Sequence, residues 1–201
     1  MRGKRAFDLC ASGLGLLLLA LPLALLALLI RLDSPGPALF RQVRVGRHGR
    51  EFHITKFRTM HVNAALTGGP LTTAHDPRIT RVGHWLRRRR LDELPQLWDV
   101  FRGAMSLVGP RPELPRYVAH YPPQLKAIVL SVRPGLTDAA SLAFRHEDQQ
   151  LQGQAQAEAI YLRQLLPAKL ALQAESVQTA TWRAELQVLW RTAAVLWERS
   201  P

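Results

Sequence analysis

The chain has 201 residues and carries 27 lysines and arginines against 15 aspartates and glutamates, which gives a net charge of +12 and a sequence pI of about 11.2. This length allows one domain with its own core beside a short terminal segment, and the charge indicates an anionic partner such as a membrane surface, phosphorylated substrates or nucleic acid. Cys10 is the single cysteine, which excludes a disulfide framework and a paired-cysteine metal site and favours a reducing compartment.

Residues 9–30 form an apolar stretch of 22 residues without a charge. A helix of this length covers about 33 Å, close to the hydrocarbon thickness of a bilayer. Pro22 is expected to bend or break that helix, and basic residues flank both of its ends, whereas a spanning helix is basic mainly on its cytoplasmic side. We therefore favour a re-entrant anchor at residues 1–32 over a plain membrane span. A cleaved signal peptide is disfavoured because no small-residue cleavage site follows the stretch.

The segment after the apolar stretch begins with Asp33-Ser34-Pro35-Gly36-Pro37, which is expected to end the helix in an extended turn. Residues 38–46 and 51–58 then alternate between apolar and polar side chains, a pattern that predicts a two-stranded element. Lys56 and Arg58 lie on its basic rim, for which a solvent-exposed strand face is the simpler interpretation. Residues 61–77 are rich in Gly, Thr, Asn and Pro and predict a long loop.

Four arginines, residues 87–90, run directly into Leu91-Asp92-Glu93-Leu94-Pro95. Apolar side chains then recur with helical spacing at Leu94, Leu97, Trp98 and Phe101. Because proline is tolerated in a first helical turn, Asp92 and Glu93 are expected at or just before a helix N-terminus. Helix capping would explain the two acids, and a solvated basic run would explain the arginines. Cations and acids so close together could also form a catalytic site. The residues alone leave both interpretations open: a catalytic role, or capping acids beside a solvated basic run.

Stiff basic turns occur at Gly109-Pro110-Arg111-Pro112 and at Arg133-Pro134-Gly135. Prolines on both sides of Arg111 fix its backbone, which suits a bidentate clamp on phosphate or carboxylate, although an ordinary tight turn is the alternative. The last predicted helix, about 179–198, has tryptophans 182, 190 and 197 along one stripe. This stripe fits either a helix at a membrane interface or packing against the core.

Six segments of the chain resemble, in order, the motifs of the bacterial sugar transferases, or monotopic phosphoglycosyl transferases. They are Lys4 to Asp8, Ser34 to Pro37, Lys56 to Met60, Leu91 to Leu97, Ser106 to Pro112 and Arg133 to Thr137. A lone Asp-Glu pair would be a weak signal, whereas six ordered motifs over nearly the whole chain are specific. The length is similar to that of the minimal form of the family.

The resemblance implies an α+β, mainly helical fold: a re-entrant helix-break-helix at residues 1–32 and a cytoplasmic domain at 33–201 with short strands and amphipathic interfacial helices. It implies transfer of a sugar-1-phosphate from a UDP-sugar to polyprenyl phosphate, usually undecaprenyl phosphate, with release of UMP and with Mg²⁺ as cofactor. This would be the first membrane step of bacterial exopolysaccharide assembly, at the cytoplasmic face of the inner membrane. Anionic membrane lipids are expected partners, and nucleic acid is not.

The resemblance also assigns roles to residues. Asp92 would attack the sugar-linked phosphorus, with Glu93 beside it as metal ligand or proton acceptor, and both acids are candidate Mg²⁺ ligands. The expected substrate-binding residues are Lys56, Arg58, Arg87, Arg111 and Arg133. Cations are needed here because an anionic nucleophile attacking a diphosphate must overcome charge repulsion.

Two positions depart from the family pattern. Asp138 stands where the family commonly has glycine, and Leu21 precedes Pro22 where the family often has serine. Besides the enzyme, two hypotheses therefore stay open: a non-catalytic membrane adaptor that binds anionic lipid or nucleic acid through its basic face, and an inactive relative in which Asp138 spoils the donor site.

Overall fold

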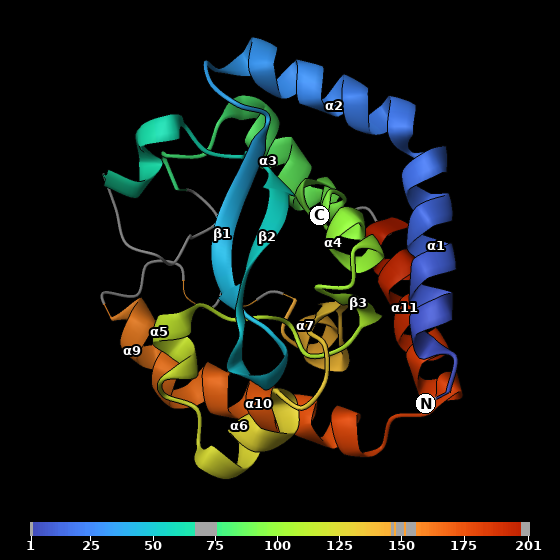
Figure 1. Ribbon diagram of the computed structural model, residues 1–201. Helices are drawn as coiled ribbons and strands as arrows, with labels where there is room; N and C mark the ends of the chain where they lie inside the picture. The colour runs from blue at the N-terminus through green and yellow to red at the C-terminus, as the bar shows by residue number, and fades with distance from the viewer. Residues whose placement is uncertain (1, 67–75, 146, 148–150, 152–155, 198–201) are drawn as a thin grey trace.

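The computed structural model describes residues 2–66, 76–145, 147, 151 and 156–197, and it is mainly helical around two small sheets (Figure 1). The N-terminal half contains α1 (Lys4–Leu18), α2 (Ala20–Asp33), β1 (Leu39–Val45), η1 (Arg47–Gly49), β2 (Glu51–Phe57), η2 (Val62–Leu66), α3 (Arg81–Arg88), η3 (Leu91–Glu93) and α4 (Gln96–Phe101). The C-terminal half contains β3 (Ser106–Val108), α5 (Pro115–Val118), α6 (Pro123–Val129), β4 (Gly135–Thr137), α7 (Ala139–Ala143), α9 (Ala157–Ile160), η4 (Tyr161–Leu165), α10 (Leu166–Gln178) and α11 (Trp182–Trp197).

The apolar N-terminal stretch folds into two helices that meet at a bend of 61°. The break lies at Leu19, three residues before Pro22. The proline ring clashes with a carbonyl of the preceding turn, which interrupts the helix there. Pro22 itself lies in the first turn of α2, where proline is tolerated. The Leu19 N–H donates to Gly15 and the Leu23 N–H donates to Leu19. These backbone groups on either side of the break are paired although Leu21 has no hydroxyl to offer.

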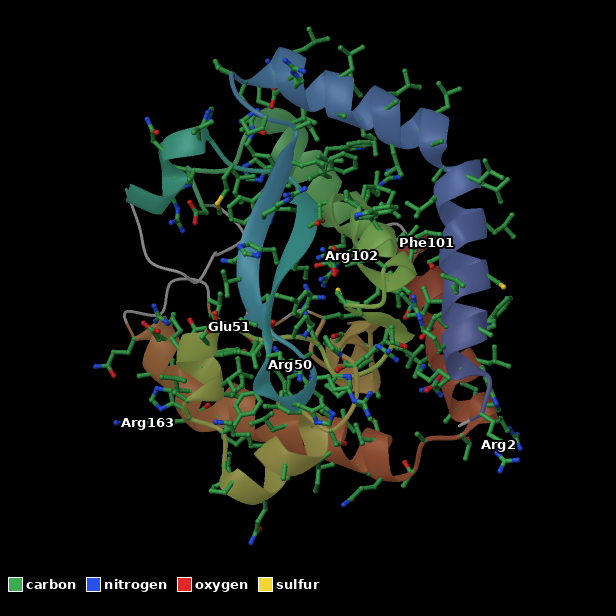
Figure 2. All side chains as sticks on the ribbon, in the orientation of Figure 1. Arg2, Arg50, Glu51, Phe101, Arg102 and Arg163 are labelled. Carbon is green, nitrogen blue, oxygen red and sulfur yellow. The ribbon has the colours of Figure 1, made fainter. Side chains whose placement is uncertain are left out.

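The outer faces of α1 and α2 expose a continuous set of leucines, which point away from the rest of the chain (Figure 2). The most exposed are Leu14, Leu17, Leu18, Leu21, Leu25, Leu28 and Leu32. No single helix among the described residues is long and apolar enough to cross a membrane, whereas α1 and α2 taken together reach that length and composition across their bend.

The inner face of α1 is joined to the rest of the chain by polar contacts. Asp8, 2% exposed, accepts hydrogen bonds from the Ser106 hydroxyl at 2.8 Å and the Leu107 N–H at 3.1 Å, which ties α1 to β3. The Arg5 guanidinium donates to the carbonyls of Val100 and Phe101, at 2.6 Å each, at the end of α4. The first two turns of α1, just before the apolar stretch, are thus joined to the domain.

The β1–β2 hairpin is antiparallel, with Leu39 opposite Phe57 and Val45 opposite Glu51, as the alternating pattern predicted. Asp99, fully buried on α4, accepts from the Thr55 N–H at 2.7 Å and so fixes α4 against β2.

A second sheet was not predicted: β3 pairs with β4 in parallel, with Ser106 opposite Gly135. A Cβ atom at Gly135 would lie 2.2 Å from the backbone of Gly109, so this close approach requires glycine. The sequence indicated only a short apolar run and a stiff turn here, because strands of three residues carry little periodicity.

Among the described residues, the buried apolar side chains form three clusters, and α1 and α2 contribute to two of them. Phe7 and Ala11 of α1 pack on a cluster around Val100 and Met105. Leu26 and Ile30 of α2 belong to a cluster with Phe57 and Leu86. The third cluster joins α5, α6 and α10.

The last helix, α11, begins at Trp182, three residues later than predicted. The Trp182 ring packs edge-on against Phe7 of α1, with ring centroids 5.6 Å apart, whereas Trp190 is 77% exposed. The predicted stripe is therefore divided between packing and exposure, and the Trp197 side chain lies outside the described part, as do residues 67–75 of the predicted loop.

Candidate functional site

Asp92 and Glu93 lie in the single 3₁₀ turn η3, between α3 and α4. Arg90 enters this turn in the left-handed conformation, with φ 54°, and α4 begins only at Gln96. Neither η3 nor α4 has a side-chain cap, so the two acids do not cap a helix by a hydrogen bond, although both lie in the first turn of η3. The pair sits on a separate turn before the helix.

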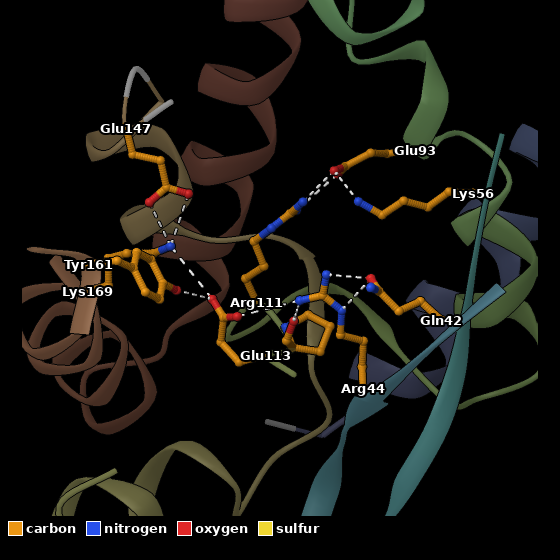
Figure 3. A network of polar contacts seen from close by, with 10 residues as sticks. Gln42, Arg44, Lys56, Glu93, Arg111, Glu113, Glu147, Tyr161 and Lys169 are labelled. Atoms are coloured by element: carbon orange, nitrogen blue, oxygen red, sulfur yellow. Dashed lines mark hydrogen bonds and ion pairs between the residues drawn. The ribbon is translucent and has the colours of Figure 1, made fainter. Parts of the chain in front are cut away.

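Glu93 is held by two cations that come from different elements (Figure 3). Lys56 of β2 donates to Oε1 at 3.0 Å, and the Arg111 guanidinium donates to both carboxylate oxygens, with 3.0 Å from Nη1 to Oε2. Burial alone would raise the pKa of Glu93, but the charges of Arg111 and Lys56 and the Arg111 hydrogen bonds hold that pKa well below its ordinary value. Glu93 therefore stays ionised and is a poor proton acceptor.

Asp92 has the opposite environment. Its half-buried carboxylate makes no hydrogen bond or ion pair with the described residues. Burial and the adjacent charge of Glu93 raise the pKa of Asp92, against the opposing charges of Lys56, Arg87 and Arg111. Two neighbouring carboxylates are thus driven apart in pKa, a pattern that assigns them different chemical roles.

Asp138 holds the Gly109–Pro112 loop, which carries Arg111, through a hydrogen bond to its backbone. Its buried carboxylate accepts from the Arg111 N–H at 3.0 Å and from Gln173 Nε2 at 2.7 Å, and it also caps α7 through the Ser141 N–H. Asp138 is the residue that departs from the family pattern. In this chain it orients the arginine that clamps Glu93.

A second carboxylate, Glu113, anchors the other end of the same loop (Figure 3). Its Oε1 accepts from the Tyr161 hydroxyl at 2.7 Å, and its Oε2 lies 3.5 Å from Nη1 of Arg44. Lys169 lies 3.7 Å from Glu113 Oε1 and 2.9 Å from Glu147. This network connects α10 and the π-helical turn η4 to the arginine loop.

The structure brings three predicted residues to the two acids and leaves two elsewhere. Lys56 and Arg111 contact Glu93, and Arg87 contributes to the electrostatic environment of Asp92. Arg58 is 5% exposed, and its guanidinium donates hydrogen bonds to Ser34, Pro37 and Met60. Arg133 donates to the Gly103 carbonyl at 2.9 Å and lines a separate cavity. The remaining arginines of the run, residues 88–90, are exposed.

The donor set allows a limited form of metal binding. Within the described ranges, no group of three His, Cys, Asp or Glu side chains is arranged to hold a metal ion. Mg²⁺, however, is often held by one or two carboxylates together with substrate phosphates and water. Asp92, whose carboxylate has no partner in the described part of the chain, fits that requirement together with the ionised Glu93.

Comparison with known proteins identifies the family. The family model described as bacterial sugar transferase matches residues 1–199. The chain belongs to the bacterial sugar transferase family. This confirms the resemblance carried by the six motifs.

Several named relatives match part of their length to this chain. The chain is 55% identical over 117 residues to undecaprenyl-phosphate glucose phosphotransferase of Komagataeibacter xylinus, a match that covers 58% of this chain and 22% of that protein. It is 46% identical over 141 residues to UDP-glucose:undecaprenyl-phosphate glucose-1-phosphate transferase of Caulobacter vibrioides, covering 69% of this chain and 53% of that protein.

A third relative is named for a different sugar. UDP-N-acetylgalactosamine-undecaprenyl-phosphate N-acetylgalactosaminephosphotransferase of Aeromonas hydrophila is 40% identical over 141 residues, covering 69% of this chain and 33% of that protein. The chain thus spans about a fifth to about half of the length of these three relatives.

Sequence reasoning missed the residues that support the bacterial sugar transferase site from outside its motifs. Arg44, Tyr161 and Lys169 were not singled out, although they join Glu113 in one network. The β1 pattern offered one signal, since Gln42 and Arg44 are two residues apart on a strand and share a face. Tyr161 and Lys169 gave none, because only the tertiary fold brings α10 to this loop.

Proposed function

We propose that this chain transfers a sugar-1-phosphate from a UDP-sugar to a polyprenyl phosphate, such as undecaprenyl phosphate, with Asp92 as the covalent nucleophile. The observation that carries the proposal is the contrast within η3: Glu93 is clamped by Lys56 and Arg111, whereas the carboxylate beside it has no partner among the described residues. The family membership and the names of the relatives support the same reaction class.

The reaction proceeds through two displacements at one phosphorus. An oxygen of ionised Asp92 attacks the sugar-linked phosphorus, the bond to the bridging oxygen breaks, and UMP leaves with that oxygen and its electron pair. An oxygen of the polyprenyl phosphate then attacks the same phosphorus and releases the Asp92 carboxylate. A raised pKa suits the nucleophile, because a more basic carboxylate attacks more strongly once it is ionised.

Positive charge must surround the reacting phosphates. Lys56, Arg111 and Arg87 all act electrostatically on Asp92, and the first two are held in place by their hydrogen bonds to the neighbouring Glu93. Preorganised donors of this kind stabilise charge that develops on phosphoryl oxygens. Glu93 is best assigned to fixing Lys56 and Arg111 and to metal binding, since its lowered pKa disfavours a base role.

Mg²⁺ is the expected cofactor, and Asp92 with Glu93 are the residues that would hold it. When bound, it would neutralise charge on the diphosphate of the donor. The chain's own groups would still have to orient that diphosphate, which is the role proposed for Arg111 and Lys56.

We also propose that α1 and α2 form a re-entrant anchor at the cytoplasmic face of the bacterial inner membrane, where anionic lipids attract the exposed arginines 88–90. If the apex at Leu19 enters the bilayer and both helices return to the surface, arms of 15 and 14 residues with a 61° bend reach a depth of about 11 Å. That depth lies within one leaflet of a core about 30 Å thick.

Topology can be tested with single cysteines in a Cys10→Ser background. Arg2→Cys and Arg41→Cys place one thiol on each side of the anchor. The re-entrant geometry predicts that a membrane-impermeant reagent reaches both only from the cytoplasmic side. Reaction of one of them from the periplasm would mean that the segment spans.

The activity is tested by UMP release in a panel of UDP-sugars, with undecaprenyl phosphate and Mg²⁺. Asp92→Asn should abolish release, whereas Glu175→Gln, which changes an exposed carboxylate on α10, should not. Full turnover by Asp92→Asn would refute covalent catalysis at this residue. No UMP release by the parent chain with any donor, combined with strongly salt-dependent RNA binding, would favour the adaptor hypothesis instead.

A further inference from the structure

A large cavity borders the loop Gly109–Pro112 that carries Arg111. Its volume is about 850 Å³, within the range of small-molecule sites, and it is bounded by the start of α1, β3, α7, the end of α10, and α11. Neither Asp92 nor Glu93 lines it, whereas Gly109, Pro110 and Asp138 do. The cavity is therefore distinct from the proposed catalytic site and shares one wall with the loop that positions Arg111.

The charged residues of this cavity leave an excess of cationic donors. Its carboxylates are paired within the protein: Asp8 with Ser106, Asp138 with Gln173, and Glu185 with Lys4 at 2.5 Å. Its arginines keep donors for a ligand. Arg191 of α11 makes no hydrogen bond or ion pair with the described residues, and Arg133 uses only its Nε atom, toward Gly103.

The rest of the cavity wall is largely apolar. Val108, Leu142, Val177 and Val188 contribute from four elements, with alanines between them. A small inorganic anion would satisfy the arginines but would leave this apolar surface in contact with water, at a cost that grows with its area. The combination fits an anion that carries a hydrocarbon body.

The position of the cavity places it near such anions, the phospholipids of the membrane. Lys4 and Arg5 line it and begin α1, one full helix length from the apex at Leu19. In the re-entrant geometry of the proposed function, on which this step rests, the start of α1 returns to the level of the lipid headgroups. The exposed Leu186 and Trp190 on α11 continue the apolar surface beside it.

We infer that this cavity binds one anionic phospholipid, with the phosphate at Arg133 and Arg191 and the acyl chains along Val108, Val177 and Val188. The site would hold the protein at the membrane through a defined lipid, in addition to diffuse attraction by the exposed arginines. Basic residues near anionic lipid contribute about 1 kcal/mol each, so loss of one cavity arginine should weaken retention about fivefold.

Native mass spectrometry of the full chain from detergent tests this inference without turnover, so its outcome does not depend on UMP release. The parent chain should retain one phosphatidylglycerol and no phosphatidylcholine at equal concentrations. Arg191→Gln should lower retention about fivefold, and Ala184→Trp, which fills the cavity from α11 without a charge change, should abolish it.

Matched controls lie on the same helix. Arg183→Gln and Ala193→Trp change exposed residues of α11 that do not line the cavity, and both should retain the lipid within about twofold of the parent. If Arg183→Gln loses as much lipid as Arg191→Gln, the attraction is diffuse surface charge and the site is refuted. Melting temperatures of all four variants separate loss of binding from loss of fold.

Two competitors distinguish the sources of the anion. Inorganic phosphate at millimolar concentration should not displace phosphatidylglycerol, because it cannot cover the apolar wall. Complete displacement by phosphate would overturn the lipid assignment. Displacement by an equal concentration of undecaprenyl phosphate would likewise overturn it and would identify the cavity as an acceptor site.

Discussion

Replacing Glu93 by glutamine removes one charge at the centre of the proposed site and preserves the shape of the side chain. Lys56 and Arg111 then lose the carboxylate that they share, and the amide nitrogen of glutamine faces one of the donors. The three side chains are only 13–23% exposed, so little solvent screens the loss. Breaking such a buried pair costs about 3–5 kcal/mol, and the partial exposure places this case near about 3 kcal/mol.

That loss should lower the melting temperature of the full chain in detergent by about 6–12 °C, at roughly 2–4 °C per kcal/mol for a protein of this size. Glu158→Gln is the matched control, because Glu158 pairs with Arg116 at a surface where the two side chains are 43% and 48% exposed. An exposed pair contributes about 0–1 kcal/mol, so this variant should melt within about 4 °C of the parent.

The same substitution makes a second, independent prediction about Asp92. Because the charge of Glu93 raises the pKa of Asp92, its removal should move the acidic limb of the pH–rate profile to lower pH, even where the maximal rate falls. The reasoning is refuted if Glu93→Gln melts like Glu158→Gln, or if the acidic limb stays in place or moves to higher pH.

Three further outcomes are expected. In the parent chain, UMP release should rise with pH through the raised pKa of Asp92, since only the ionised carboxylate attacks; a rate that falls over that interval would contradict the assignment. Asp8→Ala should destabilise the chain by at least about 2 kcal/mol in thermal unfolding, because the buried Ser106 hydroxyl and a backbone N–H lose their acceptor. Gly135→Ala should cost about 3 kcal/mol or more, because the added methyl overlaps the Gly109 backbone; an unchanged melting temperature would mean that β3 and β4 are less closely apposed.

The local features of the fold could be predicted where the pattern of side chains is set by one element. The alternation in residues 38–46 and 51–58 predicted the β1–β2 hairpin, and Pro22 predicted a bend in the apolar stretch. The bend lies at Leu19, because a proline disturbs the turn before it more than its own position. Helical spacing after residue 94 predicted α4 but placed Asp92 too close to it, since a 3₁₀ turn has no distinct apolar period.

The arrangement of the site could not be predicted, because its residues meet through contacts between segments that are distant in the sequence. Lys56 and Arg111 come from a strand and a loop that are 37 and 18 residues from Glu93 in sequence. The family motifs named both residues, but motif membership did not separate them from Arg58, which is directed to the Ser34–Pro37 turn. The role of Asp138 was also out of reach, because Gln173 and the Arg111 N–H meet it only in the folded chain.

The most direct test of the central claim is to trap the covalent intermediate. The parent chain is incubated with its UDP-sugar and Mg²⁺ without polyprenyl phosphate, quenched, and examined by mass spectrometry of the intact protein and its peptides. The account predicts one phosphosugar adduct on the peptide that contains Asp92, which undecaprenyl phosphate discharges and Asp92→Asn never forms. An adduct on another residue, or turnover by Asp92→Asn, would contradict it.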